Sequence, residues 1–120
     1  MAEKASLNAF VVSFGGENYF LDRDIERARA WKGRHVVMVS GEDIDDRELV
    51  SLCETGSMDG GGRVVIVDDA QKIKAEKALK AYVAARDPKD DSVVVVVIVR
   101  SEKCPEIWNQ AAKKGRLIEH

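Results

Sequence analysis

The stretch SVVVVVIV, from Ser92 to Val99, decides the fold of this chain, because every position after Ser92 is apolar. A strand with one solvated face alternates apolar and polar residues, whereas a strand covered on both faces is apolar throughout. The uninterrupted run therefore predicts a central strand of a parallel sheet.

Outward from this run, shorter apolar stretches alternate with helical patterns. Further strands are expected at 9–14 (AFVVSF), 35–40 (HVVMVS), 63–69 (RVVIVDD) and 116–120 (RLIEH). Strands that alternate with helices predict a three-layer α/β fold, in which a parallel sheet carries helices on both faces. No linker or repeat interrupts the pattern, so residues 1–120 are predicted to form a single domain.

Helices are expected at 18–31, from 45 to about 55, at 72–86 and at 105–114. Asn18 is expected to cap the first, and Asp45 and Glu48 have the spacing of a capping box at the start of the second. The spacing of apolar residues predicts that each of the first three helices packs an apolar stripe toward the sheet. The stripes are Leu21, Ile25 and Ala28 in the first helix, Leu49, Leu52 and Cys53 in the second, and Ala75, Ala78, Leu79, Tyr82 and Val83 in the third.

Composition narrows the function classes. Of the 120 residues, 45% are hydrophobic and 33% charged, and the formal net charge is −2, which argues against an autonomous DNA-binding surface. Cys53 and Cys104 form no CxxC pair, so we expect reduced thiols, no metal site and a cytoplasmic protein. The 93–99 run is too short to span a bilayer, so no membrane partner is expected.

One local motif points to nucleotide chemistry. Asp68 and Asp69 follow the apolar run VVIV, as in a Walker B strand whose carboxylate holds magnesium, although any parallel strand that ends in a polar turn gives the same pattern. The matching P-loop is missing, because FGGENYFLD offers Gly15 and Gly16 but no lysine or correctly placed hydroxyl. We therefore expect a degenerate nucleotide site, no cofactor and no enzymatic activity; an NTP-binding domain built on VVIVDD is the alternative.

The serial arrangement of these pieces resembles the N-terminal domain of the delta subunit of the bacterial DNA polymerase III clamp loader. The similar segments are 10–28 (FVVSFGGENYFLDRDIERA), 48–74 (ELVSLCETGSMDGGGRVVIVDDAQKIK), 92–103 (SVVVVVIVRSEK) and 113–120 (KKGRLIEH). The resemblance implies an AAA+-like, P-loop NTPase-related fold that does not hydrolyse ATP.

The resemblance also implies a binding surface for a sliding clamp. In that family a helix and the loop after it insert an apolar wedge into the clamp; the matching residues here are Leu49, Leu52, Cys53, Ser57, Met58 and Asp59. Met58 keeps an adaptable apolar side chain, but Asp59 replaces the family's aromatic residue, and an ordinary exposed loop is the alternative.

The implied partners are the sliding clamp and other clamp-loader subunits, with DNA reached only through them. The family's second and third domains have no counterpart, so we expect either a fragment or a reduced, phage-type protein. The roles of loader and of clamp inhibitor both stay open.

Overall fold

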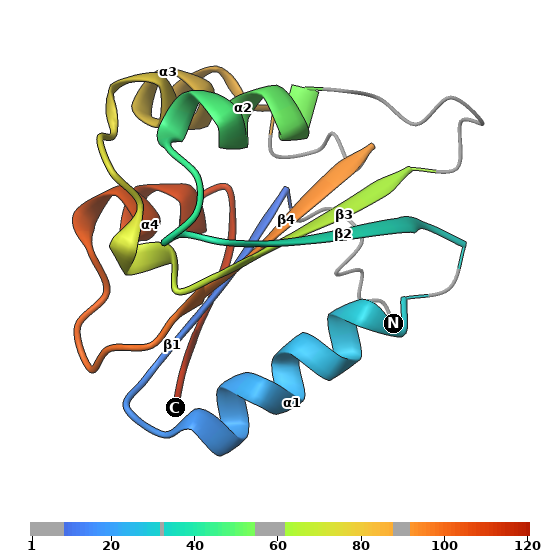
Figure 1. The fold of residues 1–120 in the computed structure, drawn as a ribbon, viewed down its shortest axis with the longest axis vertical. Helices are drawn as coiled ribbons and strands as arrows, with labels where there is room; N and C mark the ends of the chain where they lie inside the picture. The colour runs from blue at the N-terminus through green and yellow to red at the C-terminus, as the bar shows by residue number, and fades with distance from the viewer. Residues whose placement is uncertain (1–8, 32, 55–61, 88–91) are drawn as a thin grey trace.

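The computed structural model describes residues 9–31, 33–54, 62–87 and 92–120. They contain one five-stranded sheet of order β2-β3-β4-β1-β5, in which every neighbouring pair is parallel (Figure 1). The strands are β1 (Phe10–Phe14), β2 (His35–Ser40), β3 (Arg63–Asp68), β4 (Val93–Val99) and β5 (Gly115–Glu119). The helices are α1 (Asn18–Arg29), α2 (Asp46–Glu54), the 3-10 turn η2 (Ala70–Lys72), α3 (Lys77–Ala85) and α4 (Glu106–Ala112).

Strand β4 is the middle strand of the sheet, and all of its residues are buried. It pairs with β1 through Val97 and Val12 and with β3 through Val95 and Val65. The predicted α/β class, parallel sheet and central position of the 92–99 run are confirmed.

The helices cover the sheet unevenly. Helices α2, α3 and α4 lie on one face, and α1 lies on the other (Figure 1). Beneath α1, the predicted stripe of Leu21, Ile25 and Ala28 packs on Ile66, Val94, Val96 and Ile98. Within the described residues, α1 is the only helix on this face of the sheet. The part of this face that is near β5 therefore has no described helix above it.

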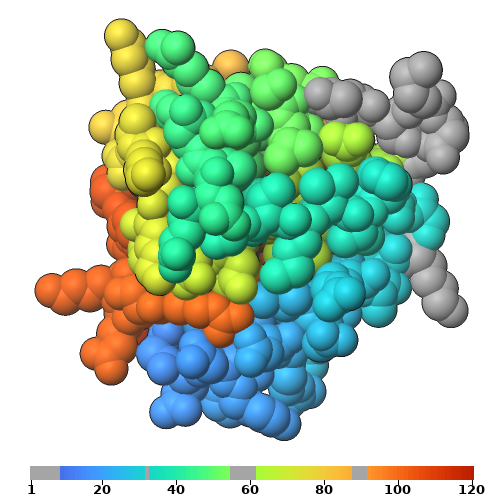
Figure 2. Space-filling model, viewed as in Figure 1, coloured from blue at the N-terminus to red at the C-terminus, as the bar shows by residue number. Residues whose placement is uncertain are grey.

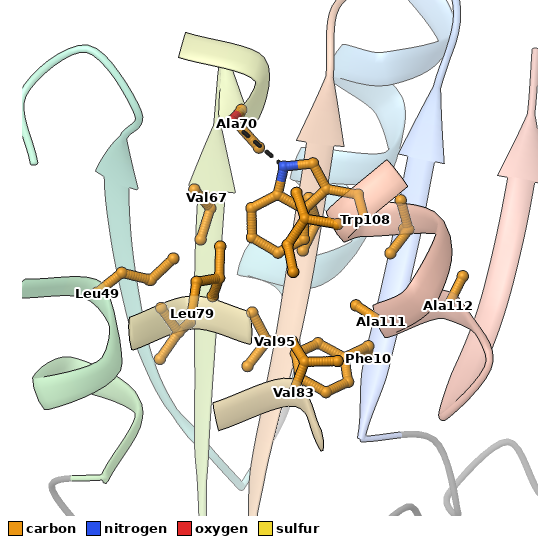
Figure 3. Packing of buried hydrophobic residues seen from close by; sticks show 14 of the residues in the cluster. Phe10, Leu49, Val67, Ala70, Leu79, Val83, Val95, Trp108, Ala111 and Ala112 are labelled. Atoms are coloured by element: carbon orange, nitrogen blue, oxygen red, sulfur yellow. Dashed lines mark hydrogen bonds between the residues drawn. The ribbon is translucent and has the colours of Figure 1, made fainter. Parts of the chain in front are cut away.

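Trp108 anchors the three-helix side. Its side chain is 1% exposed and packs among Val67, Leu79 and Val95, while its indole nitrogen donates a hydrogen bond of 3.3 Å to the carbonyl of Ala70 (Figure 3). The bond satisfies the only polar atom of the ring, so the whole indole can be buried without a desolvated donor.

Helix α2 begins with the predicted capping box. The Asp45 carboxylate accepts the Glu48 N–H at 2.9 Å, and the Glu48 carboxylate accepts the Asp45 N–H at 3.2 Å. The neighbouring carboxylate of Asp46 is buried and accepts the Ala78 N–H at 2.7 Å. Asp46 thus caps the first turn of α3 from another helix and fixes how α2 and α3 pack.

Two of the predicted helices have wrong boundaries. Asn18 is the first residue of α1, not its cap; Glu17 takes the cap position without a side-chain bond, and α1 ends at Arg29. The helix expected over 72–86 begins only at Lys77, because Ile73 is extended and Ala75 has a φ of 68°. Ala75 is accordingly exposed and not part of the buried stripe.

Gly115, expected to close the last helix, is instead the first residue of β5. A Cβ there would lie 1.7 Å from the Phe10 carbonyl oxygen. Only glycine lets α4 end this close to β1, and this approach allows β5 to join the sheet.

Candidate functional site

The carboxyl ends of β1, β3 and β4 are where a ligand would bind in a parallel α/β sheet. An ion-pair cluster lies there, formed by Arg100 after β4, Asp68 at the end of β3, and Asn18 and Asp22 in the first turns of α1. The Arg100 guanidinium reaches the Asp68 carboxylate with two nitrogens, at 2.8 and 3.3 Å. One of these two nitrogens, Nη2, also donates to Asp22 at 2.7 Å, and the remaining nitrogen, Nη1, donates to Asn18 at 2.9 Å.

This cluster engages Asp68, the residue that a Walker B motif would use to hold magnesium. The side chains of Arg100 and Asp68 are each 19% exposed, so the pair is well shielded from water. The hydrogen bond from the Arg100 guanidinium to Asp68 is the main reason that the pKa of Arg100 is raised above its usual value. Asp68 therefore has a permanent cation beside it, as well as the Asp69 N–H at 2.8 Å. Among the described residues, no group of three or more acidic, histidine or cysteine side chains could hold a metal ion.

Gly15 and Gly16 follow β1, where a P-loop would begin. A Cβ on Gly15 would lie 3.0 Å from the His120 carbonyl oxygen, and one on Gly16 would lie 3.1 Å from the Glu102 side chain. These protein contacts account for both glycines without a phosphate.

The hollow beside the two glycines has a volume of about 330 Å³, and its lining includes Glu17, Glu102 and Glu119. Several carboxylates around one hollow oppose a polyphosphate by like-charge repulsion.

Asp69 serves the turn after β3. It has a left-handed φ of 51° and precedes η2, and its carboxylate accepts the Gln71 side-chain amide at 3.3 Å. Aspartate tolerates this backbone region better than most residues. The second acid of the predicted Walker B motif is thus explained by local structure.

The predicted clamp-contact residues of α2 divide into two groups. Leu49 and Cys53 are 0% and 2% exposed and belong to the core, as the apolar stripe predicted, so they offer no side chain to a partner. Leu52, which the spacing placed in the same inward stripe, is instead half-buried and outside the core; it lines a shallow surface hollow of about 450 Å³, together with Ile44, Arg47, Glu48 and Ser51. Figure 2 shows α2 (green) at the surface beside the segment that leads into α3 (yellow). Ser57, Met58 and Asp59 lie outside the described residues.

The thiol of Cys53 is expected to be unreactive. Burial raises the pKa of its thiol to about 12, so the thiol stays protonated at neutral pH and is a poor nucleophile. Cys53 and Cys104 are both free, as predicted.

These features can be set beside known proteins. The DNA clamp loader delta protein of Bacillus subtilis (YqeN) superposes on this chain with a TM-score of 0.73 and 20% sequence identity. The chain shares its fold with a clamp-loader delta protein. The superposition covers 94% of this chain but 38% of that protein, so the chain spans well under half of its length.

No protein-family profile matches the chain, and no curated protein matches it. Within the described residues, no helix is both long and apolar enough to cross a membrane.

Sequence reasoning missed Arg100, Asn18 and Asp22 as members of the cluster. The sequence did contain a signal for Arg100. Arg100 directly follows β4, and Asp68 ends the neighbouring strand β3. The carboxyl ends of adjacent parallel strands meet at one edge of the sheet, so the two residues could have been expected to lie close together. Asn18 was assigned to a cap, which concealed that its amide oxygen accepts a bond from Arg100.

Proposed function

We propose that this chain is a non-catalytic, clamp-loader delta-like module of DNA replication that binds a sliding clamp through the outer face of α2 and the segment after it. The observation that carries the proposal is the fold shared with a clamp-loader delta protein over nearly the whole chain. The outer face of α2 supports it, because Ile44 and Leu52 give this face accessible apolar surface.

The energetics favour a modest contact. Met58 is an apolar residue of the sequence that follows α2, and burying it in a preformed pocket contributes about 2 kcal/mol. Asp59 opposes burial, since its carboxylate must stay hydrated or find a cationic partner. We therefore expect the α2 surface and Met58 to act together.

The first test is surface plasmon resonance on immobilised bacterial sliding clamp. Met58→Ala should weaken binding about tenfold or more, from the lost apolar burial. Asp59→Phe should strengthen it, because an aromatic anchor replaces a carboxylate that must be desolvated. Leu52→Ala should also weaken it, since Leu52 is the half-buried apolar residue of α2 that faces outward.

Lys103→Ala is the matched control, because Lys103 is exposed in the loop after β4 and belongs to no part of this surface. If Met58→Ala and Leu52→Ala both bind like the unchanged chain, the surface is elsewhere and the proposal fails.

The second test concerns nucleotide. We propose that the chain binds neither ATP nor Mg·ATP, because Asp68 is paired with Arg100 and the glycine turn faces carboxylates. Calorimetric titration with ATP and magnesium should give no heat of binding. Micromolar affinity that requires magnesium would instead favour the alternative, an NTP-binding domain built on VVIVDD.

A further inference from the structure

A third hollow lies on the opposite side of the sheet from α2, between α1 and the strands β1 and β5. Its volume is about 200 Å³, and its apolar lining comes from Val11, Ala28, Val96, Ile118 and the ring of Trp31. Pockets for small molecules typically hold roughly 300–1,000 Å³. A hollow of this size is better matched to a single apolar side chain than to a free metabolite.

The charges around the hollow are unbalanced. Arg27 of α1 and Arg116 of β5 both line it, and neither forms an ion pair with another described residue. The guanidinium of Arg34 lies 5.4 Å from the centre of the Trp31 ring. Asp24 is the only acidic residue of the lining, and its carboxylate is held by His120 at 2.7 Å. The rim therefore offers cations to an incoming carboxylate.

The floor of the hollow contains an unsatisfied polar group. Ser13 is 0% exposed, yet its hydroxyl makes no hydrogen bond in the described structure. Buried hydroxyls nearly always have a partner; an aliphatic side chain in the hollow would leave this one unpaired, whereas the hydroxyl of Tyr or the indole N–H of Trp would pair with it.

The adjoining sheet edge suits an extended chain. Among the described strands β5 pairs with β1 alone, so no described strand pairs with the backbone N–H and C=O groups on its other side. Leu117 at its centre is 45% exposed. A peptide strand added here would form backbone bonds to β5 and place every second side chain on the α1 side of the sheet, next to the hollow.

We propose that the hollow between α1 and β5 is a docking site for an acidic, extended segment of a partner protein. One apolar side chain of the segment fills the hollow, and carboxylates two residues before and after it pair with Arg27 and Arg116. The site does not depend on the proposed clamp contact, since α2 lies on the other face of the sheet (Figure 1).

The probe is a mixture of end-capped peptides Thr-Asp-Thr-X-Thr-Asp-Thr, in which X is Leu, Ile, Met, Phe, Tyr or Trp. It is titrated into the full ¹⁵N-labelled chain and followed by NMR. Trp31 and Trp108 are the only tryptophans, so each indole N–H gives one signal. Saturable shifts are expected for the Trp31 indole and the β5 amides, with the buried Trp108 indole unmoved.

A charge reversal gives the decisive comparison. Arg27 and Arg116 are exposed, so the double variant Arg27→Glu/Arg116→Glu should keep the fold. If the Glu variant does not fold, the double variant Arg27→Gln/Arg116→Gln is used in its place. The Glu variant should lose affinity for the acidic peptides by about tenfold or more. It should gain affinity for the matched Thr-Lys-Thr-X-Thr-Lys-Thr mixture, which the unchanged chain should not bind; the Gln variant should lose the acidic peptides without gaining the basic ones.

Three results overturn the proposal: no saturable shift at millimolar peptide, equal affinity for the acidic mixture after charge neutralisation or reversal, or shifts that bypass Trp31 and β5. Self-association of the free chain through β5, detected as a dimer by sedimentation, would assign the edge to a second copy and also overturn it. Clamp binding by the double variant is measured in parallel and should be unchanged, so failure here is distinguishable from failure of the proposed function.

Discussion

Replacing Trp108 by alanine should lower the free energy of unfolding by about 3–5 kcal/mol, the usual cost of removing a buried aromatic side chain. Trp108 is among the largest fully buried side chains and bridges α4, η2 and the central strands. The loss is a large fraction of the roughly 5–15 kcal/mol that stabilises a typical domain. Urea denaturation followed by circular dichroism measures it without relying on tryptophan fluorescence.

The chain supplies a matched control in its other tryptophan. Trp31 is 37% exposed after the end of α1, so Trp31→Ala should cost less than about 1 kcal/mol. If the two substitutions cost the same, the packing of α4 on the sheet contributes far less to stability than the buried indole indicates.

The parts of the fold that the sequence predicted correctly are those set by a single strong physical constraint. The apolar run after Ser92 can be stable only with both faces covered, and β4 is the middle strand with every residue buried. The capping box of Asp45 and Glu48 is likewise local, because both partners lie within one helical turn. Short-range chemistry of this kind is visible in the sequence alone.

The errors arise where distant residues override local preference. The 72–76 segment has helix-forming residues, but its backbone forms a bridge between Lys74 and Asp45, and the first turn of α3 is capped by Asp46 from another helix. Neither contact has a signal within the segment itself. The pairing of Arg100 with Asp68 is similar, since the two residues are 32 positions apart and meet only because β3 and β4 are neighbours.

The predicted site residues show the same division. Gly15, Gly16, Asp68 and Asp69 do lie at one end of the sheet, as the order of strands required, but their contacts are with protein groups. For the α2 surface, helical spacing identified the face of Leu49 and Cys53 that packs inward. It wrongly placed Leu52 in the same inward stripe, because the hollow that Leu52 lines with Ile44 depends on how α2 lies beside the loop before it.

The Arg100 cluster leads to the second large effect. Arg100→Met keeps the aliphatic stem but removes the guanidinium, which leaves Asp68 shielded from water and without its cation. Breaking a fully buried ion pair costs about 3–5 kcal/mol; because both side chains here are 19% exposed, we expect a loss of about 2 kcal/mol. Arg100→Lys should recover only part of it, since one ammonium cannot reproduce the two-nitrogen contact with Asp68 and the bonds to Asp22 and Asn18.

A double-mutant cycle with Asp68→Asn separates the ion pair from general damage. In the Asp68→Asn background, Arg100→Met should cost at least about 1 kcal/mol less than it does alone, because the unpaired buried charge is gone.

The single variant Arg100→Met also tests whether the guanidinium excludes a metal ion. It leaves oxygens of Asp68, Asp22 and Asn18 around one space, and magnesium and calcium prefer oxygen ligands. We expect millimolar magnesium to raise the melting temperature of Arg100→Met by a few degrees and to leave that of the unchanged chain where it was. Equal responses to magnesium in both proteins would show that Arg100 does not stand in for a cation, and additive losses in the cycle would show that its contact with Asp68 contributes nothing beyond the separate side chains.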